Sequence, residues 1–183
     1  HLDENRRATI VFRLGGLTSE LHGSSLLPQV LGTLVGSVVG NRVPVIDGLP
    51  GPPAEDWLKA LGAAAASAGS VGMFHVVGAT PEAPTLDAAL GGHQPAEVVV
   101  VAPDDLRRTR DRLNTARLDG RQSDALATVS LGTPHYSVTE FGRFVEALGD
   151  RRVHPGVDVY ISTGRVILEE IEEPGWAEDQ PSA

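Results

Sequence analysis

The chain has 183 residues with no cysteine, and its 15 basic against 24 acidic side chains give a formal net charge of −9. This length suits one compact domain, and the lack of cysteine excludes disulfides, thiolate metal ligands and a cysteine nucleophile within these residues. The excess of acidic side chains argues against a general affinity for nucleic acids or anionic membranes, because both are themselves negatively charged.

The amino-terminal residues are charged and lack the apolar stretch of a secretory signal. The most apolar run, residues 26–40, is shorter than the ~20 residues that a bilayer requires and contains Pro28, Gln29 and Ser37. We therefore expect a buried helix there and a cytoplasmic protein. The chain starts without methionine, so one alternative is that it is a piece of a longer protein.

Short apolar runs alternate with helical patterns along the whole chain. Helices are expected to begin at Ser25, Ala54 and Pro103, and a capping box of Ser137 and Glu140 predicts another. In chain order the expected elements are a strand at 8–14, a helix at 25–40, a strand at 43–48, a helix at 54–67, a strand at 71–78, a helix at 86–90, a strand at 97–102, a helix at 103–115, a strand at 125–131, a helix at 137–148, a strand at 157–162 and a helix at 165–172.

Strands separated by helices favour right-handed crossovers and a mostly parallel sheet between helix layers. The predicted fold class is therefore α/β, a three-layer α/β/α domain over residues 1–173, with a flexible tail at 174–183 and a mobile loop at 117–123. Gly32, Gly36 and Gly40 recur every four residues and predict a smooth helix face that approaches a sheet or another helix closely.

Functional sites of such sheets gather at the carboxyl ends of the strands, which selects the loops at 47–48, 75–82, 132–137 and 162–165. The sequence contains no glycine-rich dinucleotide or phosphate-binding motif, no nucleophile elbow and no zincin motif. The function must therefore come from residues in these four loops.

Thr133 and His135 lie in a segment that leaves a strand and enters a capped helix, where backbone N–H groups can hold an anionic group. The imidazole of His135 can exchange protons near neutral pH. The alternative is that Gly132 and Pro134 only shape a turn and that His135 is a surface residue.

His75 interrupts an apolar strand, and Thr80 and Glu82 follow it in a loop. An imidazole and a carboxylate at one sheet edge would suit general acid–base chemistry. The alternative is a hydrogen-bonded core histidine beside a loop that merely starts a helical turn.

Ser162, Thr163 and Arg165 end the last strand and start the last helix. Arg165 could bind a carboxylate with both guanidinium nitrogens, or it could pair with Glu169 on the helix surface. The arginines of helix 103–115 alternate with aspartates and predict a solvated face.

Four segments together resemble the aconitase X family: residues 43–50 (VPVIDGLP), 74–83 (FHVVGATPEA), 131–137 (LGTPHYS) and 162–165 (STGR). The resemblance covers nearly the whole chain. It implies an aconitase-like domain of a hydro-lyase that dehydrates a small hydroxy acid such as cis-3-hydroxyproline, with an iron or iron–sulfur centre acting on the leaving hydroxyl. It also implies partners outside these residues, namely an upstream large-subunit region and a small swivel domain or subunit.

By this resemblance Thr133 and His135 would touch the substrate or a metal-bound water. Ser162, Thr163 and Arg165 would hold a carboxylate or phosphate, and His75, Thr80 and Glu82 would line the same cleft. Many members of the family carry cysteine in the two loops where this chain has Thr133 and Ser162, so no metal ligand is assigned here. The alternative is a non-catalytic module of the same fold that binds a small anion or a partner subunit.

Overall fold

The computed structural model describes residues 2–114 and 126–173. The predicted loop at 117–123 and the predicted tail at 174–183 lie outside these ranges. The chain divides into two compact units, His1–Ala116 and Arg117–Ala183, and each is described by itself. That residues 1–173 act as one domain stays a prediction.

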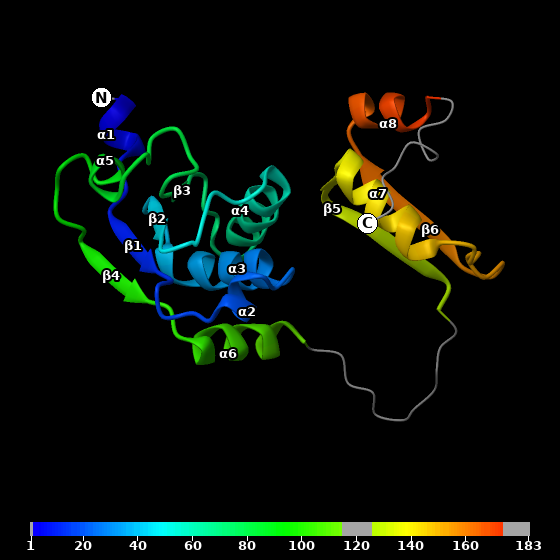
Figure 1. Ribbon diagram of the computed structural model, residues 1–183, viewed down its shortest axis with the longest axis horizontal. Helices are drawn as coiled ribbons and strands as arrows, with labels where there is room; N and C mark the ends of the chain where they lie inside the picture. The colour runs from blue at the N-terminus through cyan, green and yellow to red at the C-terminus, as the bar shows by residue number, and fades with distance from the viewer. Residues whose placement is uncertain (1, 115–125, 174–183) are drawn as a thin grey trace. The chain divides into compact units, whose positions relative to one another are not determined.

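Unit 1 is built on a four-stranded sheet in which every pairing is parallel, with the order β3-β2-β1-β4 (Figure 1). The strands are β1 (Ile10–Arg13), β2 (Pro44–Asp47), β3 (His75–Val76) and β4 (Glu97–Val100). The predicted parallel α/β class is confirmed. The strands are shorter than the apolar runs, and the predicted strand at 71–78 is reduced to the two residues of β3, because only these pair with β2.

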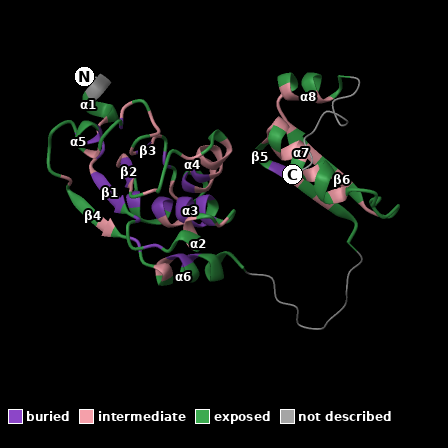
Figure 2. Cartoon of the chain, in the orientation of Figure 1, coloured by how far each residue is buried: buried purple, intermediate pink, exposed green. Residues whose placement is uncertain are grey.

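One face of this sheet packs against α3 (Leu27–Val39) and α4 (Glu55–Gly69), and α6 (Pro103–Leu113) adds Leu106 to the same core. The buried side chains of this core include Ile10, Phe12 and Ile46 from the sheet. Figure 2 shows the buried residues of unit 1 concentrated on β1, β2 and α3. Within the described part of the chain, no helix is both long and apolar enough to cross a membrane.

The helices α3 and α4 approach closely because glycines face each other across their contact. A Cβ added to Gly36 would lie 2.9 Å from the Ala68 Cβ, and one added to Gly69 would lie 2.9 Å from the Gly36 Cα. Gly32 meets Ala64 of α4 in the same way. The smooth helix face predicted from the glycine spacing is therefore observed at Gly32 and Gly36, and its partner is another helix. Gly40 is not part of it, because Gly40 follows the end of α3 and a Cβ there would meet no atom within 4 Å.

The opposite face of the sheet carries Val11 and Val45, which pack with Ala8, Ala83, Ala89 and Leu90. The cover comes from the short helix α5 (Leu86–Ala89), tied to the start of β1 by the Ala8 N–H, which donates to the Ala89 carbonyl at 2.8 Å. Helical segments thus lie on both sides of the sheet. Val98 and Val100 of the edge strand β4 remain 46% and 67% exposed.

Unit 2 contains a two-stranded parallel sheet of β5 (Thr128–Tyr136) and β6 (Asp158–Thr163) with the helices α7 (Val138–Leu148) and α8 (Arg165–Ile171). Ser137 caps α7: its side chain accepts from the Glu140 N–H, and the Glu140 carboxylate accepts from the Ser137 N–H at 2.9 Å. The predicted capping box is confirmed. The strand before it runs five residues further than the predicted end at Leu131.

Three features of the chain differ from the sequence prediction. The helix α3 starts after Leu26, and Ser24 rather than Ser25 supplies a nearby hydroxyl, which accepts from the Leu26 N–H at 3.3 Å. Two short helices, α1 (Leu2–Arg6) and α2 (Ser19–His22), were not predicted. Helices of four or five residues carry too few apolar positions to show a helical period.

Substitution of Gly36 by alanine is expected to lower the free energy of unfolding of unit 1 by about 1–3 kcal/mol, because the new methyl group forces α3 and α4 apart. This loss outweighs the gain of about 1 kcal/mol that alanine offers within a helix. Urea denaturation of G36A measures the change. Gly16→Ala is the control, since a Cβ there meets no atom within 4 Å; equal stability of the two variants would contradict the close packing.

Candidate functional site

The predicted site residues fall into two groups, one in each unit. Thr133, His135, Ser162, Thr163 and Arg165 belong to unit 2, whereas His75, Thr80 and Glu82 belong to unit 1. That both line the same cleft stays a prediction.

The unit 2 group lies where β5 departs from regular pairing with β6. Leu131 pairs with Ile161 and Tyr136 pairs with Thr163, so the four residues 132–135 of β5 stand opposite the single residue Ser162. The segment predicted as a loop is thus a bulge inside a longer strand. Bulges of this kind often occur beside active sites, because they redirect side chains that regular pairing would place on the sheet faces.

Gly132 is essential to the bulge. Its φ is +93°, a region that favours glycine, and a Cβ at this position would lie 2.8 Å from the Ser162 N. The backbones of the bulge and of Ser162 are therefore in direct contact. Thr133 and His135 follow at once and are both exposed.

The three predicted residues at the end of β6 and the start of α8 differ in their surroundings. Ser162 is exposed, whereas Thr163 is partly buried and its hydroxyl donates to the Tyr136 carbonyl at 2.7 Å. Arg165 is exposed and, among the residues that the structure describes, forms no ion pair. The alternative pairing of Arg165 with Glu169 is not observed, and the guanidinium is available to an anion.

The start of α7 has a carboxylate of its own. The Ser137 hydroxyl accepts from the Glu140 N–H, and the Glu140 carboxylate accepts from the Ser137 N–H. This carboxylate lies at the positive end of the helix, where the sequence predicted a substrate anion. That backbone N–H groups here hold such an anion, and that Thr133, His135 and Arg165 take part in the chemistry, stay predictions.

In unit 1, His75 lies on a face of the sheet and not at its carboxyl edge. Val45 pairs with both Val11 and His75, and side chains in register point to the same face. The ring is 1% exposed, and its Nε2 donates to the Arg6 carbonyl at 2.6 Å. The edge placement expected for His75 is wrong, because this strand begins with the histidine.

Glu82 reaches this histidine from the loop after β3. Its Oε2 lies 3.9 Å from the His75 Nδ1, and its Oε1 forms an ion pair with the Arg6 guanidinium. The Nδ1 has no hydrogen-bond partner. Thr80 closes the loop, because its hydroxyl accepts from the Val76 N–H at 3.0 Å. Arg6 is thus held twice, through its carbonyl and through its side chain.

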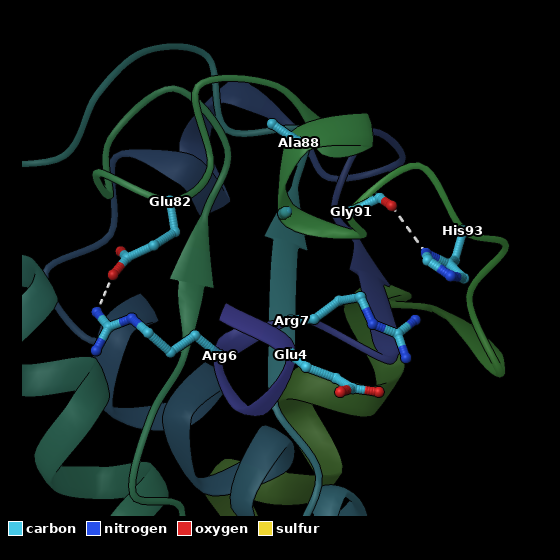
Figure 3. Close-up of a pocket in the computed structure, with 8 residues that line it drawn as sticks. Glu4, Arg6, Arg7, Glu82, Ala88, Gly91 and His93 are labelled. Carbon is cyan, nitrogen blue, oxygen red and sulfur yellow. Dashed lines mark hydrogen bonds and ion pairs between the residues drawn. The ribbon is translucent and has the colours of Figure 1, made fainter. Parts of the chain in front are cut away.

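A cavity of about 540 Å³ adjoins this cluster near the start of β1. Figure 3 shows the ion pair of Arg6 and Glu82 on one side of the cavity and Arg7 and His93 on the other, where the His93 Nδ1 donates to the Gly91 carbonyl. The remaining lining residues are Glu4, Ala88 and Ala89. Sequence analysis missed Arg6, Arg7 and His93, because no motif links residues this far apart in the chain.

The chain does not fit an iron–sulfur centre of its own. It has no cysteine, and the described residues contain no group of three histidine, aspartate or glutamate side chains that could hold a metal ion. Thr133 and Ser162 offer neutral hydroxyls, which are weak ligands compared with thiolates or imidazoles.

Comparison with known proteins agrees with this fold. The family model described as "Aconitase X second domain" matches residues 8–111, within unit 1. The cis-3-hydroxy-L-proline dehydratase of Pseudomonas aeruginosa is 38% identical over 178 residues, which are 96% of this chain and 29% of that protein. The phosphomevalonate dehydratase large subunit of Methanothermobacter thermautotrophicus is 35% identical over 91% of this chain and 37% of that protein.

Among solved structures, the holo-form of Thermococcus kodakaraensis aconitase X matches with a TM-score of 0.71 and 29% identity, over 97% of this chain and 42% of that one. The fold is thus that of a parallel α/β domain found in a dehydratase family. The chain belongs to the aconitase X family, as its sequence motifs suggested. It spans about a third of the length of the curated relatives it matches.

Replacement of His75 by alanine is expected to cost about 2–4 kcal/mol of unfolding free energy, because it leaves a cavity at a buried position and removes the hydrogen bond to the Arg6 carbonyl. His93→Ala, which removes an exposed ring, is expected to change stability by less than about 0.5 kcal/mol. Urea denaturation of both variants makes the comparison. A stable H75A variant would show that the histidine does not hold α1 to the sheet.

Proposed function

We propose that this chain is part of a hydro-lyase that removes water from a small hydroxy acid, with the bulge of β5 and the end of β6 facing the substrate. Family membership and the names of the relatives support the reaction class. The observation that carries the site is the juxtaposition of the exposed bulge residues Thr133 and His135 with Ser162. Arg165 follows and forms no ion pair with any residue that the structure describes. A cis-3-hydroxyproline-type substrate is the specific proposal.

Dehydration requires a proton to leave one carbon and a hydroxyl group to leave its neighbour. A substrate carboxylate also has to be held so that both bonds are aligned. Arg165 is suited to the carboxylate, since a guanidinium forms two parallel hydrogen bonds to it. His135 is suited to proton transfer, and the hydroxyls of Thr133 and Ser162 can donate hydrogen bonds to substrate oxygens.

The other predicted residues have positioning roles in this proposal. Thr163 donates to the Tyr136 carbonyl and so holds the end of the bulge. His75, Thr80 and Glu82 bond to the protein around them and order the loop of unit 1. Thiolate ligands of any iron–sulfur centre would have to come from outside these 183 residues, because the chain has no cysteine.

Arg165→Ala, introduced into the complete enzyme, is expected to raise KM about 10- to 100-fold, which corresponds to the loss of charged hydrogen bonds to the carboxylate. Arg165→Lys should restore part of the affinity, since a lysine keeps the charge but not the paired geometry. Steady-state kinetics with a hydroxyproline substrate measures both. Arg110→Ala on α6 is the control, and an Arg165 variant that behaves like it would remove Arg165 from the site.

His135→Ala is expected to lower kcat by about 100-fold or more while KM changes little, as loss of a general acid or base does. The pH profile of kcat should lose one limb in His135→Gln, which a merely structural role would not cause. Unchanged kcat and an unchanged profile would exclude His135 from proton transfer. If the chain shows no dehydratase activity alone or together with its partner regions, the result would favour the alternative of a non-catalytic module.

A further inference from the structure

A buried histidine of unit 1 has one ring nitrogen without a hydrogen-bond partner. His75 is 1% exposed, and its Nδ1 forms no hydrogen bond. Its Nε2 lies 2.6 Å from the carbonyl oxygen of Arg6. Most buried polar atoms are paired, because an unpaired one costs free energy. The Nδ1 of His75 is thus an exception, and the contacts around it all lie inside unit 1.

The two acceptors beside the ring restrict how it is protonated. A carbonyl oxygen only accepts hydrogen bonds, so the Nε2 carries a proton. The Nδ1 faces the carboxylate of Glu82, whose Oε2 lies 3.9 Å away and also only accepts. In a neutral ring with its proton on Nε2, the Nδ1 lone pair would face this negative charge. A second proton on Nδ1 replaces the repulsion by the attraction of an ion pair.

Two effects oppose a charged ring. A group removed from water favours its neutral form, and the Arg6 guanidinium, which pairs with the other oxygen of Glu82, is a like charge (Figure 3). The contact at Nε2 favours the charged form. At 2.6 Å it is shorter than the usual N–H···O hydrogen bond, and charged donors form shorter bonds than neutral ones. The short bond and the facing carboxylate together indicate an imidazolium.

The loop after β3 fixes the position of the Glu82 carboxylate. The Gly78 N–H donates to the Ala83 carbonyl at 2.8 Å, and the Ala83 N–H donates to the Thr80 carbonyl at 2.9 Å. The backbone around Glu82 is therefore hydrogen-bonded on both sides. The carboxylate is held beside the ring by the fold of this loop.

Arg6 and Glu82 are the charged groups that contact the ring. From β2, the position paired with His75 is the apolar Val45. The other titratable side chains around the adjoining cavity are Glu4, Arg7 and His93. Within the described part of the chain, none of these three forms a hydrogen bond or an ion pair with His75.

We propose that His75 is a buried imidazolium that holds α1 against the loop after β3, and that this attachment weakens as the pH rises. The ring binds the last residue of α1 through Nε2 and Glu82 through Nδ1, and Glu82 also binds the Arg6 side chain. Loss of the Nδ1 proton restores the repulsion, so the stabilisation is present while the ring is charged and is lost at higher pH.

The short helix α1 makes this attachment consequential. It has five residues, and a helix of this length does not form stably without tertiary contacts. Its position therefore depends on the ring and on Glu82. The proposal uses contacts of unit 1 alone, so it is independent of the proposed substrate and of the roles of His135 and Arg165.

Nuclear magnetic resonance of the ring nitrogens tests the proposal in the complete enzyme prepared with isotope-labelled histidine. The His75 signal is the one that His75→Gln removes. We expect a proton on both ring nitrogens at the acidic end of the range of about pH 5–8, in which histidine changes charge, and on Nε2 alone at the other end. A single proton throughout this range would overturn the charged ring, and two protons throughout would overturn the pH response.

Glu82→Gln separates the charge of this side chain from its shape. The amide oxygen can still accept from Arg6, and the amide N–H can donate to an unprotonated ring nitrogen. In the wild type, the opening equilibrium measured by hydrogen exchange at the Arg7 and Gly78 amides is expected to rise about 10-fold between about pH 6 and 8, because a charged contact is lost. In E82Q it should stay constant.

Glu4→Gln is the matched control, because Glu4 is an exposed carboxylate of α1 that lines the same cavity. This variant should keep the response of the wild type to pH. Equal responses of the wild type and E82Q would overturn the proposal, and so would a response that E4Q removes as completely as E82Q does.

Discussion

Both sheets in the described part of the chain are parallel, and a parallel sheet is stable only where helices or further strands remove its faces from water. Unit 1 satisfies this constraint. Its helices α3 and α4 cover one face, and α5 covers part of the other. The close approach of α3 to α4, which Gly36 and Gly69 permit, makes this cover dense. Unit 2 meets the constraint only in part, because α7 and α8 leave its sheet incompletely covered.

This difference in burial also separates two kinds of polar residue. His75 is enclosed by unit 1 and bonds to the backbone of Arg6, so it behaves as part of the core. Thr133 and His135 lie exposed in the bulge of β5 opposite the exposed Ser162, and the exposed Arg165 begins α8 two residues after β6 ends. Groups that meet a substrate must be reachable from solvent, which favours the unit 2 group as the part of the chain that takes part in chemistry.

Much of the fold was predictable from local sequence. The alternation of strands and helices, the capping box at Ser137 and the glycine spacing of α3 all act between residues close in the chain, and the structure agrees with each. The lengths of the strands were not predictable, because the run at 71–78 is apolar throughout while only His75 and Val76 find a partner strand. Pairing depends on a neighbour that the local sequence does not reveal.

The sequence by itself determined the parallel α/β class, the family and the candidate residues of the β5 and β6 segments, since these follow from periodicity and short motifs. Only the tertiary structure decided that His75 bonds to Arg6 and faces Glu82, and that residues 132–135 bulge opposite Ser162. His75 lies 69 positions from Arg6 and 7 from Glu82, and Ser162 lies 27 to 30 positions from the bulge. They depend on strand register and on which faces are covered, and both are set by packing between distant segments.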